Sequence, residues 1–308
     1  MPKVTTTWFC SSCGNESSQW MGQCPACGEW NTMVEEPKTK KSPGSAIWGA
    51  GRRRAYIDDG GAKPARLDEI SLDRDNRFSI GIGELDRVLG GGLVEGSLVL
   101  IGGEPGIGKS TLSLQIPISC RDLKTLYVSG EESPRQIKLR ADRLGGSDGE
   151  CLILSETSLE NILAQAESVK PSLLIVDSIQ TIYSDAIESS AGSVSQVREC
   201  AASLLRYAKK SGTPVILIGH ITKDGTIAGP KVLEHIVDVV LQFEGDTKGS
   251  YRILRSIKNR FGSTDELAVF EMTGAGLREV NNPSEILIPM HKDDLSGVAI
   301  GAMMDGSR

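Results

Sequence analysis

One octapeptide constrains this chain more than any other feature of its sequence. It follows a short apolar run, Ser97–Gly102, and it precedes a stretch from Lys109 to about Cys120 that has the pattern of a helix. Its residues are Gly103, Glu104, Pro105, Gly106, Ile107, Gly108, Lys109 and Ser110, which fit the pattern G-x-x-x-x-G-K-[ST]. A strand that turns through glycines into a helix N-terminus presents backbone N–H groups and a positive dipole to an anion. Because a strand and a helix flank the octapeptide, we predict a phosphate-binding loop rather than a chance match in a glycine-rich loop.

The last residues of the octapeptide indicate which ligand the loop takes. A lysine in the place of Lys109 supplies a cation to the β- and γ-phosphates of a nucleotide, and the hydroxyl of Ser110 is a Mg²⁺ ligand. We therefore expect ATP and Mg²⁺ as cofactors, with nucleotide contacts from Gly103 through Thr111.

Apolar runs alternate with helical patterns in the part of the chain that follows Leu67. Further strands are expected at Thr125–Ser129, Cys151–Leu154, Leu173–Val176 and Val215–Gly219, and helices at Pro134–Leu144, Leu159–Val169 and Val194–Ser211. This alternation predicts an α/β fold in which a mainly parallel sheet has helices on both faces. Later apolar runs are expected to add antiparallel strands at one edge of the sheet, at Val237–Glu244, Tyr251–Ile257 and Leu267–Met272.

An acidic residue ends one of these strands. The apolar run Leu173–Val176 leads directly into Asp177. An aspartate at a strand end is usually a turn residue, but downstream of a phosphate loop it can orient the magnesium shell. We predict that Asp177 and Ser110 together hold Mg²⁺.

Hydrolysis also needs a group that orients the attacking water. Glu131 and Glu132 follow the strand Thr125–Ser129, which we expect to lie next to the strand that enters the phosphate loop. We predict Glu131 as the catalytic acid and keep Glu132 as its alternative, although both could be solvated acids before the next helix. His220 and Thr222 lie at the end of another strand, where they either sense the γ-phosphate or are structural.

Four cysteines form two C-x-x-C pairs near the N-terminus. They are Cys10, Cys13, Cys24 and Cys27, with ten residues between the pairs. Two such pairs can close four thiolates around Zn²⁺, and a block of about 25 residues with almost no core needs such a staple to fold. We predict a structural zinc, because four sulfur ligands leave no open position; four free thiols are the alternative. Trp8, Trp20 and Trp30 either pack over this ribbon or offer a stacking surface, and we expect packing.

Composition and charge limit the class of protein. The net charge of −6 excludes a generally basic protein that coats nucleic acid, so any DNA contact must come from local cations. The seven cysteines are an odd number, which argues against a closed disulfide framework. No apolar run reaches the roughly 18 residues of a membrane span and no signal peptide opens the chain, so we expect a cytoplasmic protein without membrane contact.

Changes in composition divide the chain into four parts. We expect a zinc ribbon over residues 1–34, a basic flexible linker over 35–66, an ATPase core over 67–282 and a final segment over 283–308. The linker is rich in Pro, Gly, Lys and Arg and has little periodic apolar content, which is typical of a chain without a packed core.

Together, these motifs resemble the bacterial RadA (also called Sms) DNA-repair ATPases, which are relatives of RecA. The resemblance includes the cysteine ribbon, the phosphate loop and four further runs, Gly90–Ser97, Gly130–Ser133, Gly219–Lys223 and Lys258–Gly262. The last run, Lys-Asn-Arg-Phe-Gly, is a marker of the family. The resemblance implies a RecA-like core that assembles into a ring, a hexamer in this family, with ATP between subunits and DNA in the central channel.

The resemblance also implies roles for particular residues. Lys258 and Arg260 resemble residues that approach the nucleotide of the neighbouring subunit and stabilise phosphoryl transfer there. The loops Ser184–Gln196 and Lys223–Lys231 resemble channel-facing DNA loops, with the lysines at both ends of the second loop as phosphate contacts. On residue types alone, Lys258 and Arg260 would share one face of a strand, and the alternative is an exposed basic strand.

By this resemblance the chain is a DNA-dependent ATPase of homologous recombination and DNA repair, which processes recombination intermediates by branch migration and translocation on single-stranded DNA. Its implied partners are single-stranded and branched DNA and a RecA-type recombinase. Family members carry a C-terminal domain that resembles the Lon protease domain, of which residues 283–308 would contain only the start. Two alternatives are a RecA/KaiC-type regulatory ATPase that acts on protein partners and a nucleotide-gated binding module that scarcely hydrolyses ATP.

Overall fold

The computed structural model describes residues 5–10, 15–38, 77–146, 149–220, 233–245 and 249–282. A small antiparallel sheet of order β2-β1-β3 lies near the N-terminus, and a larger sheet of nine strands has the order β14-β13-β12-β11-β6-β10-β9-β7-β8. The strands of the small sheet are β1 (Thr5–Cys10), β2 (Glu16–Ser17) and β3 (Met33–Lys38). A third sheet consists of two antiparallel strands, β4 (Arg77–Phe78) and β5 (Leu93–Val94).

The nine-stranded sheet combines a parallel part and an antiparallel part. The parallel strands are β6 (Leu98–Gly103), β7 (Thr125–Ser129), β8 (Cys151–Ser155), β9 (Leu173–Asp177), β10 (Val215–His220) and β11 (Val239–Glu244). The antiparallel strands are β12 (Tyr251–Asn259), β13 (Leu267–Thr273) and β14 (Gly276–Glu279). The expected mainly parallel α/β sheet is therefore confirmed.

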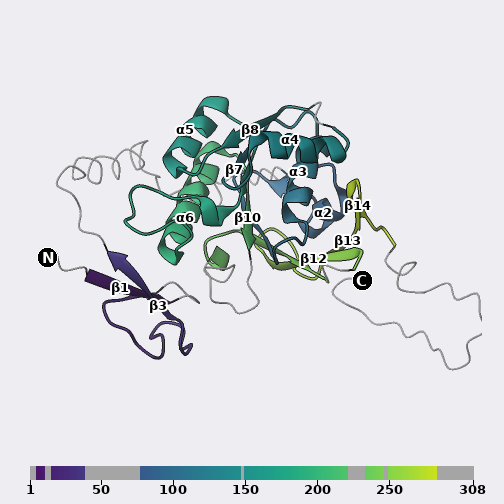
Figure 1. The fold of residues 1–308 in the computed structure, drawn as a ribbon. Coiled ribbons are helices and arrows are strands. Elements are labelled where there is room, and N and C mark those ends of the chain that lie inside the picture. Colours follow the sequence, from purple (N-terminus) through teal and green to yellow (C-terminus); the bar gives the residue numbers. More distant parts are fainter. Residues whose placement is uncertain are drawn as a thin grey trace, which may run out of the picture.

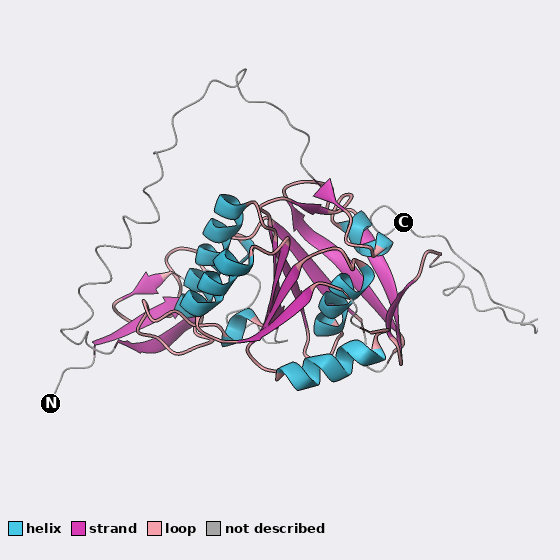
Figure 2. Cartoon of the chain, turned by 90° about the horizontal axis from the view of Figure 1, so that it is seen from above, coloured by secondary structure: helices cyan, strands magenta, loops and turns pink. Residues whose placement is uncertain are grey.

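Helices cover both faces of the sheet (Figures 1 and 2). They are α2 (Gly83–Val88), α3 (Lys109–Ser119), α4 (Pro134–Arg143), α5 (Leu159–Val169) and α6 (Val194–Ser211), with a short 3-10 turn, η2, at Ile179–Thr181. The ranges expected for α5 and α6 match the observed helices. The short helix α2 and the strand β14 were not predicted, because each is too short to show a period in the sequence.

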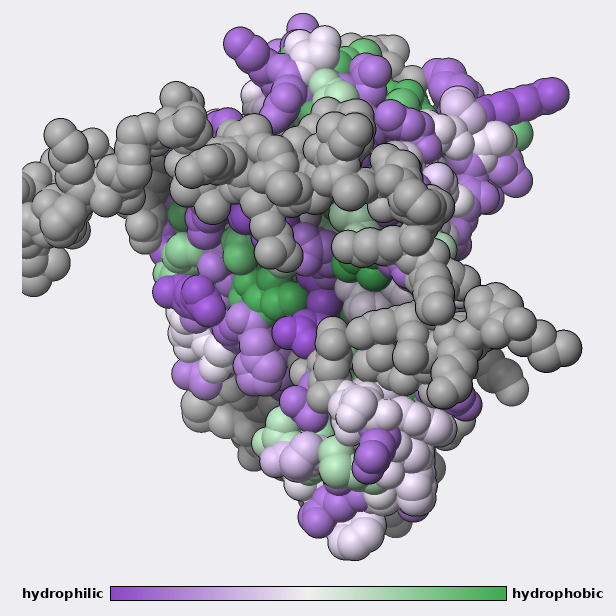
Figure 3. Space-filling model, turned by 90° about the vertical axis from the view of Figure 1, so that its left-hand side faces the viewer, coloured by the Kyte–Doolittle hydropathy of each residue, from purple (hydrophilic) through white to green (hydrophobic). Residues whose placement is uncertain are grey.

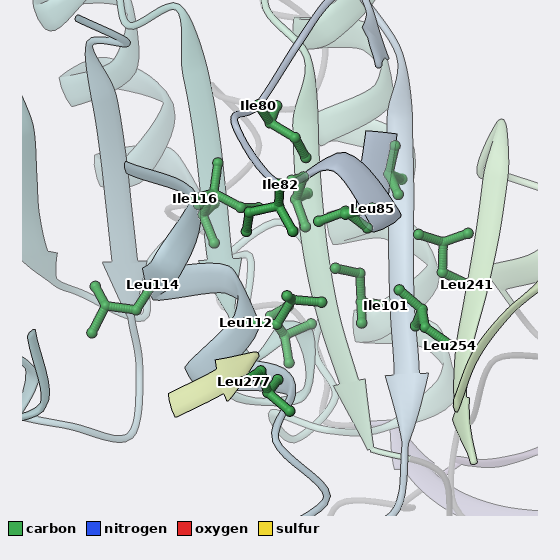
Figure 4. Packing of buried hydrophobic residues seen from close by; sticks show 14 of the residues in the cluster. Ile80, Ile82, Leu85, Ile101, Leu112, Leu114, Ile116, Leu241, Leu254 and Leu277 are labelled. Carbon is green, nitrogen blue, oxygen red and sulfur yellow. The ribbon is translucent and has the colours of Figure 1, made fainter. Parts of the chain in front are cut away.

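Two apolar layers sandwich the parallel strands. Along β6, Val99 and Ile101 pack on the face covered by α2 and α3, whereas Leu98 and Leu100 pack on the face covered by α6. Figure 4 shows the first layer, in which Leu112 of α3 and Leu277 of β14 lie among the side chains around the sheet. Strands buried on both faces read as continuous apolar runs, which is why the sequence indicated them clearly.

Two expectations about the sheet were wrong. The strand that enters the phosphate loop, β6, lies between β10 and β11, and β7 is separated from it by β9 and β10. In addition, β11 pairs with β6 in the parallel direction, so the antiparallel part begins only at β12. An apolar run indicates that a strand is buried but carries no information about its neighbours, so strand order had to come from the packed structure.

On the face shown in Figure 3, hydrophilic residues are mixed with smaller apolar patches. Among the helices in the described ranges, none has the length and apolar content that crossing a membrane requires.

Candidate functional site

The phosphate loop links the carboxyl end of β6 to the start of α3 (Figure 1). Gly108 has a φ of 118°, which a residue with a side chain rarely adopts, and it serves as the N-cap of α3. Ile107 is 1% exposed and packs in the apolar layer between α3 and the sheet. The loop is thus held by one buried side chain while its backbone turns around the helix N-terminus.

A buried arginine also supports the loop. Arg252 of β12 is 3% exposed, and its Nε donates a hydrogen bond to the carbonyl oxygen of Ile107 at 3.1 Å. Its Nη1 donates to the carbonyl oxygens of Gly249 and Tyr251. Sequence reasoning missed Arg252, although a cation on the buried face of an otherwise apolar strand is an unusual signal.

Lys109 folds back onto the loop. Its Nζ donates to the carbonyl oxygens of Gly103 at 2.8 Å and Glu104 at 2.9 Å, and the residue is 4% exposed. Burial lowers the pKa of Lys109 to about 8, although the negative charges of Asp177 and Glu131 oppose this shift. The structure therefore brings Lys109 near both predicted acids.

Asp177 ends β9 and is 8% exposed. Its Oδ2 accepts a hydrogen bond from the hydroxyl of Tyr127 at 2.7 Å. Asp177 is close enough to Lys109 to act on its pKa, and Ser110, which is half-buried, begins the same helix as Lys109. A carboxylate and a hydroxyl are oxygen ligands of the kind that Mg²⁺ prefers, so these residues fit a nucleotide-bound magnesium ion.

Glu131 and Glu132 face different partners. The Oε1 of Glu131 accepts a hydrogen bond from the Oγ of Ser178 at 2.7 Å and lies 3.6 Å from the Nε2 of His220. Glu132 instead forms an ion pair with Arg140 of α4. Three parallel strands, β7, β9 and β10, thus place Glu131, Ser178 and His220 together at their carboxyl ends.

His220 also has a polar atom without a partner. Its Nδ1 is buried, and within the described part of the chain it makes no hydrogen bond. The carbonyl oxygen of His220 accepts a long hydrogen bond from Gln180 at 3.4 Å. Neither contact identifies a γ-phosphate sensor, so this role of His220 stays a prediction.

The last residue of the loop Ser184–Gln196 holds the loop together through hydrogen bonds of its side chain. Gln196 is 1% exposed, and its side-chain amide donates to the carbonyl oxygens of Ser184, Ile187 and Ser189 while accepting from the Ser184 N–H. The loop contains no Lys or Arg but includes Asp185. Side-chain cations for DNA phosphates therefore have to come from other segments.

Lys258 and Arg260 lie at the opposite end of the sheet from the phosphate loop. Asn259 pairs with Val239, which pairs with Val99 near the start of β6. From Val99 to Gly103 the strand rises by about 13 Å at roughly 3.3 Å per residue. The β12 strand ends at Asn259, so Arg260 follows the strand rather than sharing a regular face with Lys258.

Both cations bind the segment that enters β11. The Nζ of Lys258 donates to the carbonyl oxygens of Glu234 at 2.5 Å and Val237 at 2.9 Å, and the Nη1 of Arg260 lies 3.5 Å from the Oδ1 of Asp238. Burial lowers the pKa of Lys258, and the charge of Arg260 lowers it further, while Asp238 and Glu234 raise it. The two cations are therefore close in space, although β12 ends at the residue between them.

Asp238 links these cations to the strand of the phosphate loop. It is 2% exposed, and its Oδ2 accepts from the Leu98 N–H at 3.1 Å and from the Nζ of Lys209 at 2.9 Å. The same Nζ lies 5.8 Å from the centroid of the Phe261 ring. The buried carboxylate of Asp238 thus has several hydrogen-bond donors, as buried polar groups usually do. It holds Arg260, Lys209 and the start of β6 together.

The other residues of the run Lys258–Gly262 have structural roles. Asn259 accepts from the Phe261 N–H at 2.9 Å and donates to the Leu89 carbonyl oxygen at 3.4 Å. The carbonyl oxygen of Phe261 accepts from Arg77. These contacts tie the turn after β12 to β4 and to the residue that follows α2.

The cysteine ribbon contains a metal-binding geometry. The Sγ atoms of Cys10, Cys24 and Cys27 all lie within 4.8 Å of one another, and those of Cys10 and Cys27 are 3.6 Å apart. Sulfur ligands on a tetrahedral zinc, at about 2.3 Å each, lie about 3.8 Å apart, so the three thiols fit such an ion. Gly28 directly follows the second pair with a φ of 73°, as expected for a tight turn around sulfur.

The tryptophans of the ribbon do not share one environment. Trp8 packs against the small core that includes Cys10 and Cys24. Trp20 and Trp30 are 55% and 69% exposed. The expected packing was therefore wrong for Trp20 and Trp30, because the short turns that carry them offer too little apolar surface to bury an indole ring.

Some predicted features lie outside the described residues. These are Cys13, Thr222, the loop Lys223–Lys231, and residues 39–76 and 283–308.

Family models match both parts of the chain. The rubredoxin metal binding domain matches residues 8–35, which contain all four cysteines of the ribbon. The KaiC ATPase model matches residues 78–152, which contain the phosphate loop and both candidate acids after β7. The chain therefore combines a metal-binding ribbon with a KaiC-type ATPase domain.

Solved structures share the fold of the core. The KaiC-like protein of Pyrococcus horikoshii is similar with a TM-score of 0.54 and 22% identity, over 67% of this chain and 99% of that chain. The RadB recombinase is similar with a TM-score of 0.50 and 26% identity, over 66% of this chain and 99% of that chain. The RecA-like fold expected from the sequence is thus confirmed.

Curated relatives resemble the whole of this chain. DNA repair protein RadA of Bacillus subtilis is 51% identical over 100% of this chain and 67% of the relative, and RadA of Pseudomonas aeruginosa is 47% identical with the same coverage. RadA of Halalkalibacterium halodurans is 49% identical over 100% of this chain and 66% of the relative. The chain spans about two thirds of the length of these relatives. It belongs to the RadA family of bacterial DNA repair proteins.

Proposed function

We propose that this chain is an ATPase that acts in DNA recombination and repair. The observation that carries the proposal is the convergence of Lys109, Asp177 and Glu131 at the carboxyl ends of β6, β9 and β7. Ligands of open α/β sheets bind at this end of the strands, where loops meet. The RadA relatives are named as DNA repair proteins, which favours the same purpose for this chain.

Each residue of the cluster has a separate task in ATP hydrolysis. Lys109 leaves the carbonyl oxygens of its own loop and binds the β- and γ-phosphates, while Ser110 and Asp177 hold Mg²⁺. When bound, Mg²⁺ neutralises charge on the phosphate oxygens. Glu131 orients the attacking water, because its carboxylate is half exposed and is aimed by Ser178. Nucleotide contacts come from Gly103–Thr111.

The site is completed by a neighbouring subunit. Lys258 and Arg260 lie at the amino end of the sheet, so they are remote from the phosphate loop of their own chain. In a head-to-tail ring, the amino end of one sheet can face the carboxyl end of the next. The two cations then approach the neighbour's γ-phosphate and stabilise the charge of phosphoryl transfer. A ring of six subunits is the arrangement that we propose.

The motor acts on DNA. Single-stranded and branched DNA are the proposed substrates, with translocation and branch migration as the outcome and a RecA-type recombinase as a partner. The cations proposed to contact DNA are Lys223 and Lys231, since the loop Ser184–Gln196 supplies no Lys or Arg. Their contacts should be salt-dependent.

ATP turnover measured with and without single-stranded DNA tests this proposal. We expect turnover in the presence of Mg²⁺, stimulation by DNA at low salt, and loss of that stimulation as salt rises. The mass in solution with ATP and DNA should increase to that of a ring. ATP turnover that DNA leaves unchanged, together with no DNA binding at low salt, would contradict the DNA part of the proposal.

A regulatory ATPase that acts on protein partners is the second candidate. Two observations favour it: the KaiC model matches residues 78–152, and the loop Ser184–Gln196 contains acids but no Lys or Arg. Under this alternative, ATP hydrolysis would proceed at the same Lys109 and Glu131 but would not respond to DNA. The turnover experiment above separates the two candidates.

The ribbon metal is zinc, bound by Cys10, Cys13, Cys24 and Cys27. Three of these thiols have a sulfur spacing that suits a tetrahedral ion, and the match to a rubredoxin metal binding domain supports a four-cysteine site. With four sulfur ligands, the ion has no open position for a substrate, so its role is to fold the ribbon.

A further inference from the structure

Tyr127 is a buried residue that the catalytic scheme above does not use. It lies in the middle of β7 and is 1% exposed. Its side chain packs in the apolar layer between α3, α4 and the sheet, together with Ile175 of the neighbouring strand. Its hydroxyl donates to the Oδ2 of Asp177 at 2.7 Å.

The register of two strands produces this contact. Tyr127 pairs with Ile175 and Ser129 pairs with Asp177 in the parallel ladder of β7 and β9. Alternate residues of a strand point to the same face, so Tyr127 and Asp177 are diagonal neighbours on one face of the sheet. The contact is therefore built into the parallel pairing and needs no loop to hold it.

The hydroxyl is not required for packing. A phenylalanine would fill the same apolar layer, and burying a hydroxyl without a partner would cost free energy. Burial and the negative charge of Asp177 raise the pKa of Tyr127 well above its usual value, so the phenol keeps its proton and acts as a donor. Within the described ranges, the hydroxyl of Tyr127 donates to one acceptor, the Oδ2 of Asp177.

The bond leaves one oxygen of Asp177 available. Within the described part of the chain, the Oδ1 of Asp177 has no hydrogen-bond partner, and Lys109 is close enough to be affected by the charge of the carboxylate. A carboxylate held at one oxygen loses rotational freedom and presents the other in a fixed direction. Ligands of a metal site are commonly oriented by hydrogen bonds of this kind.

We propose that Tyr127 is a positioning residue for Asp177. The hydroxyl of Tyr127 holds the carboxylate of Asp177 so that its Oδ1 faces the magnesium ion of a bound nucleotide. The inference rests on the proposed ATPase function of the same site. It assigns the phenol no contact with nucleotide or water, so Tyr127 acts only through Asp177.

Nucleotide binding at a series of Mg²⁺ concentrations tests the inference. The probe is a fluorescent ATP analogue, and the variant is Tyr127→Phe. The matched control is Tyr207→Phe, since Tyr207 of α6 is also buried but packs on the other side of the sheet. In Tyr127→Phe, the Mg²⁺ concentration for half-maximal binding should rise about tenfold, as expected for losing a hydrogen bond to a charged group. Binding in EDTA should not change.

Turnover gives a second readout. At saturating Mg²⁺, kcat of Tyr127→Phe should fall while KM for ATP stays near its original value, and Tyr207→Phe should change neither. A wild-type Mg²⁺ midpoint in a folded Tyr127→Phe protein would overturn the inference. If the parent protein itself shows no Mg²⁺-dependent nucleotide binding, the proposed function fails instead.

A double variant keeps the test decisive if Tyr127→Phe lowers stability. In an Asp177→Asn background, Tyr127→Phe should cause no further shift in the Mg²⁺ midpoint, because the residue that it positions no longer carries the charge. Thermal unfolding of the parent, the two single variants and the double variant separates this effect from a general loss of stability. Equal shifts in both backgrounds would contradict a role through Asp177.

Discussion

The carboxylate of Glu131 accepts a hydrogen bond from the hydroxyl of Ser178 at 2.7 Å. The bond joins the residues after β7 to the residue after β9, and Asp177 immediately precedes Ser178. The proposed water-orienting acid and the proposed metal ligand are thus held at one place by neighbouring strands, although Glu131 and Asp177 are far apart in the sequence.

Replacing Glu131 by Gln should abolish most turnover. The amide cannot accept a proton from the attacking water, so we expect a loss of about 100-fold or more, in the range of general-base catalysis. Nucleotide affinity should change little, because the proposed role of Glu131 is to orient water and not to bind a phosphate. Glu132→Gln is the matched control, since Glu132 is paired with Arg140. Measurement of kcat and of nucleotide Kd for both variants decides between the acids, and an equal loss in Glu132→Gln would refute the assignment.

The depressed pKa of Lys109 predicts how stability depends on pH in the absence of nucleotide. The pKa falls from 10.5 to about 8 on folding, so between these values the unfolded chain binds more protons than the folded chain. Stability therefore rises with pH over this window, by at most about 3 kcal/mol, and below pH 8 the full cost of burying the cation is present.

Urea unfolding of the parent protein and of Lys109→Met measures this cost. The Met variant should be the more stable of the two near pH 7, and its advantage should shrink as the pH rises from 8 to 10.5. Lys138→Met is a suitable control, because the Lys138 side chain is 58% exposed and should show no such pH dependence. A constant difference between parent and Lys109→Met across this range would be inconsistent with a buried, charged Lys109.

The sequence was most informative where a local pattern determines structure. The run Thr125–Ser129 is buried on both faces of its strand, and its bounds match those of β7. The helix Val194–Ser211 is capped by Ser193, whose hydroxyl accepts from the Gln196 N–H, and it ends before Gly212, which has a left-handed conformation. Such start and stop signals lie within a few residues of the helix, so they can be recognised from sequence.

Long-range relationships could not be predicted in the same way. No local pattern indicates that β9 and β10 separate β7 from β6, or that Arg252 reaches Ile107 from a strand 145 positions later in the chain. The hydrogen bond from Tyr127 to Asp177 depends on the pairing of two strands and is likewise invisible until the sheet is assembled. The sequence therefore predicted which residues belong to the candidate site, but not the residues that hold them in place, Arg252 and Tyr127.

Substitution of Cys24 tests the ribbon metal. Cys24→Ser should lose the one zinc per chain that a four-thiolate site holds, and should unfold the ribbon while leaving the ATPase core folded. Metal analysis together with unfolding measurements reports both effects. Cys200→Ser is the control, because Cys200 is buried in the core on α6, far in sequence from the cluster of Cys10, Cys24 and Cys27. Unchanged zinc content in Cys24→Ser would exclude this thiol as a ligand.

Arg252 should influence nucleotide affinity through the phosphate loop. In Arg252→Met, the Ile107 carbonyl loses a charged donor and the loop loses a buried positive charge, so the affinities for ATP and ADP should fall together, by about tenfold. Turnover of the enzyme once saturated with ATP should be largely retained. Arg255→Met is the control, since Arg255 pairs with Glu244 near the surface of the same strand. Nucleotide affinity at the parent value in a folded Arg252→Met protein would rule out this support.

The position of Lys258 and Arg260 leads to a prediction about mixed rings. Arg260→Ala should lower turnover but leave nucleotide binding by the separate subunit intact, because Arg260 lies at the other end of the sheet from Gly103. Lys109→Ala should lose binding at its own loop. In an equal mixture of the two variants, about one quarter of the interfaces in a head-to-tail ring combine an intact loop with an intact cation. The mixture should thus recover about a quarter of parental turnover, although each variant alone is nearly inactive.

This recovery distinguishes action between subunits from action within one. If Arg260 served the nucleotide of its own chain, every subunit in the mixture would carry a defect in its own site, and no recovery would occur. Lys258→Ala should behave as Arg260→Ala does, whereas Lys210→Ala, a change in the last turn of α6, should leave turnover near the parental value. Measurement of ATP turnover across mixing ratios, with the mass of the assembly recorded in the same samples, gives the curve to compare. A maximum at equal mixing supports a site shared between subunits, and a flat baseline contradicts it.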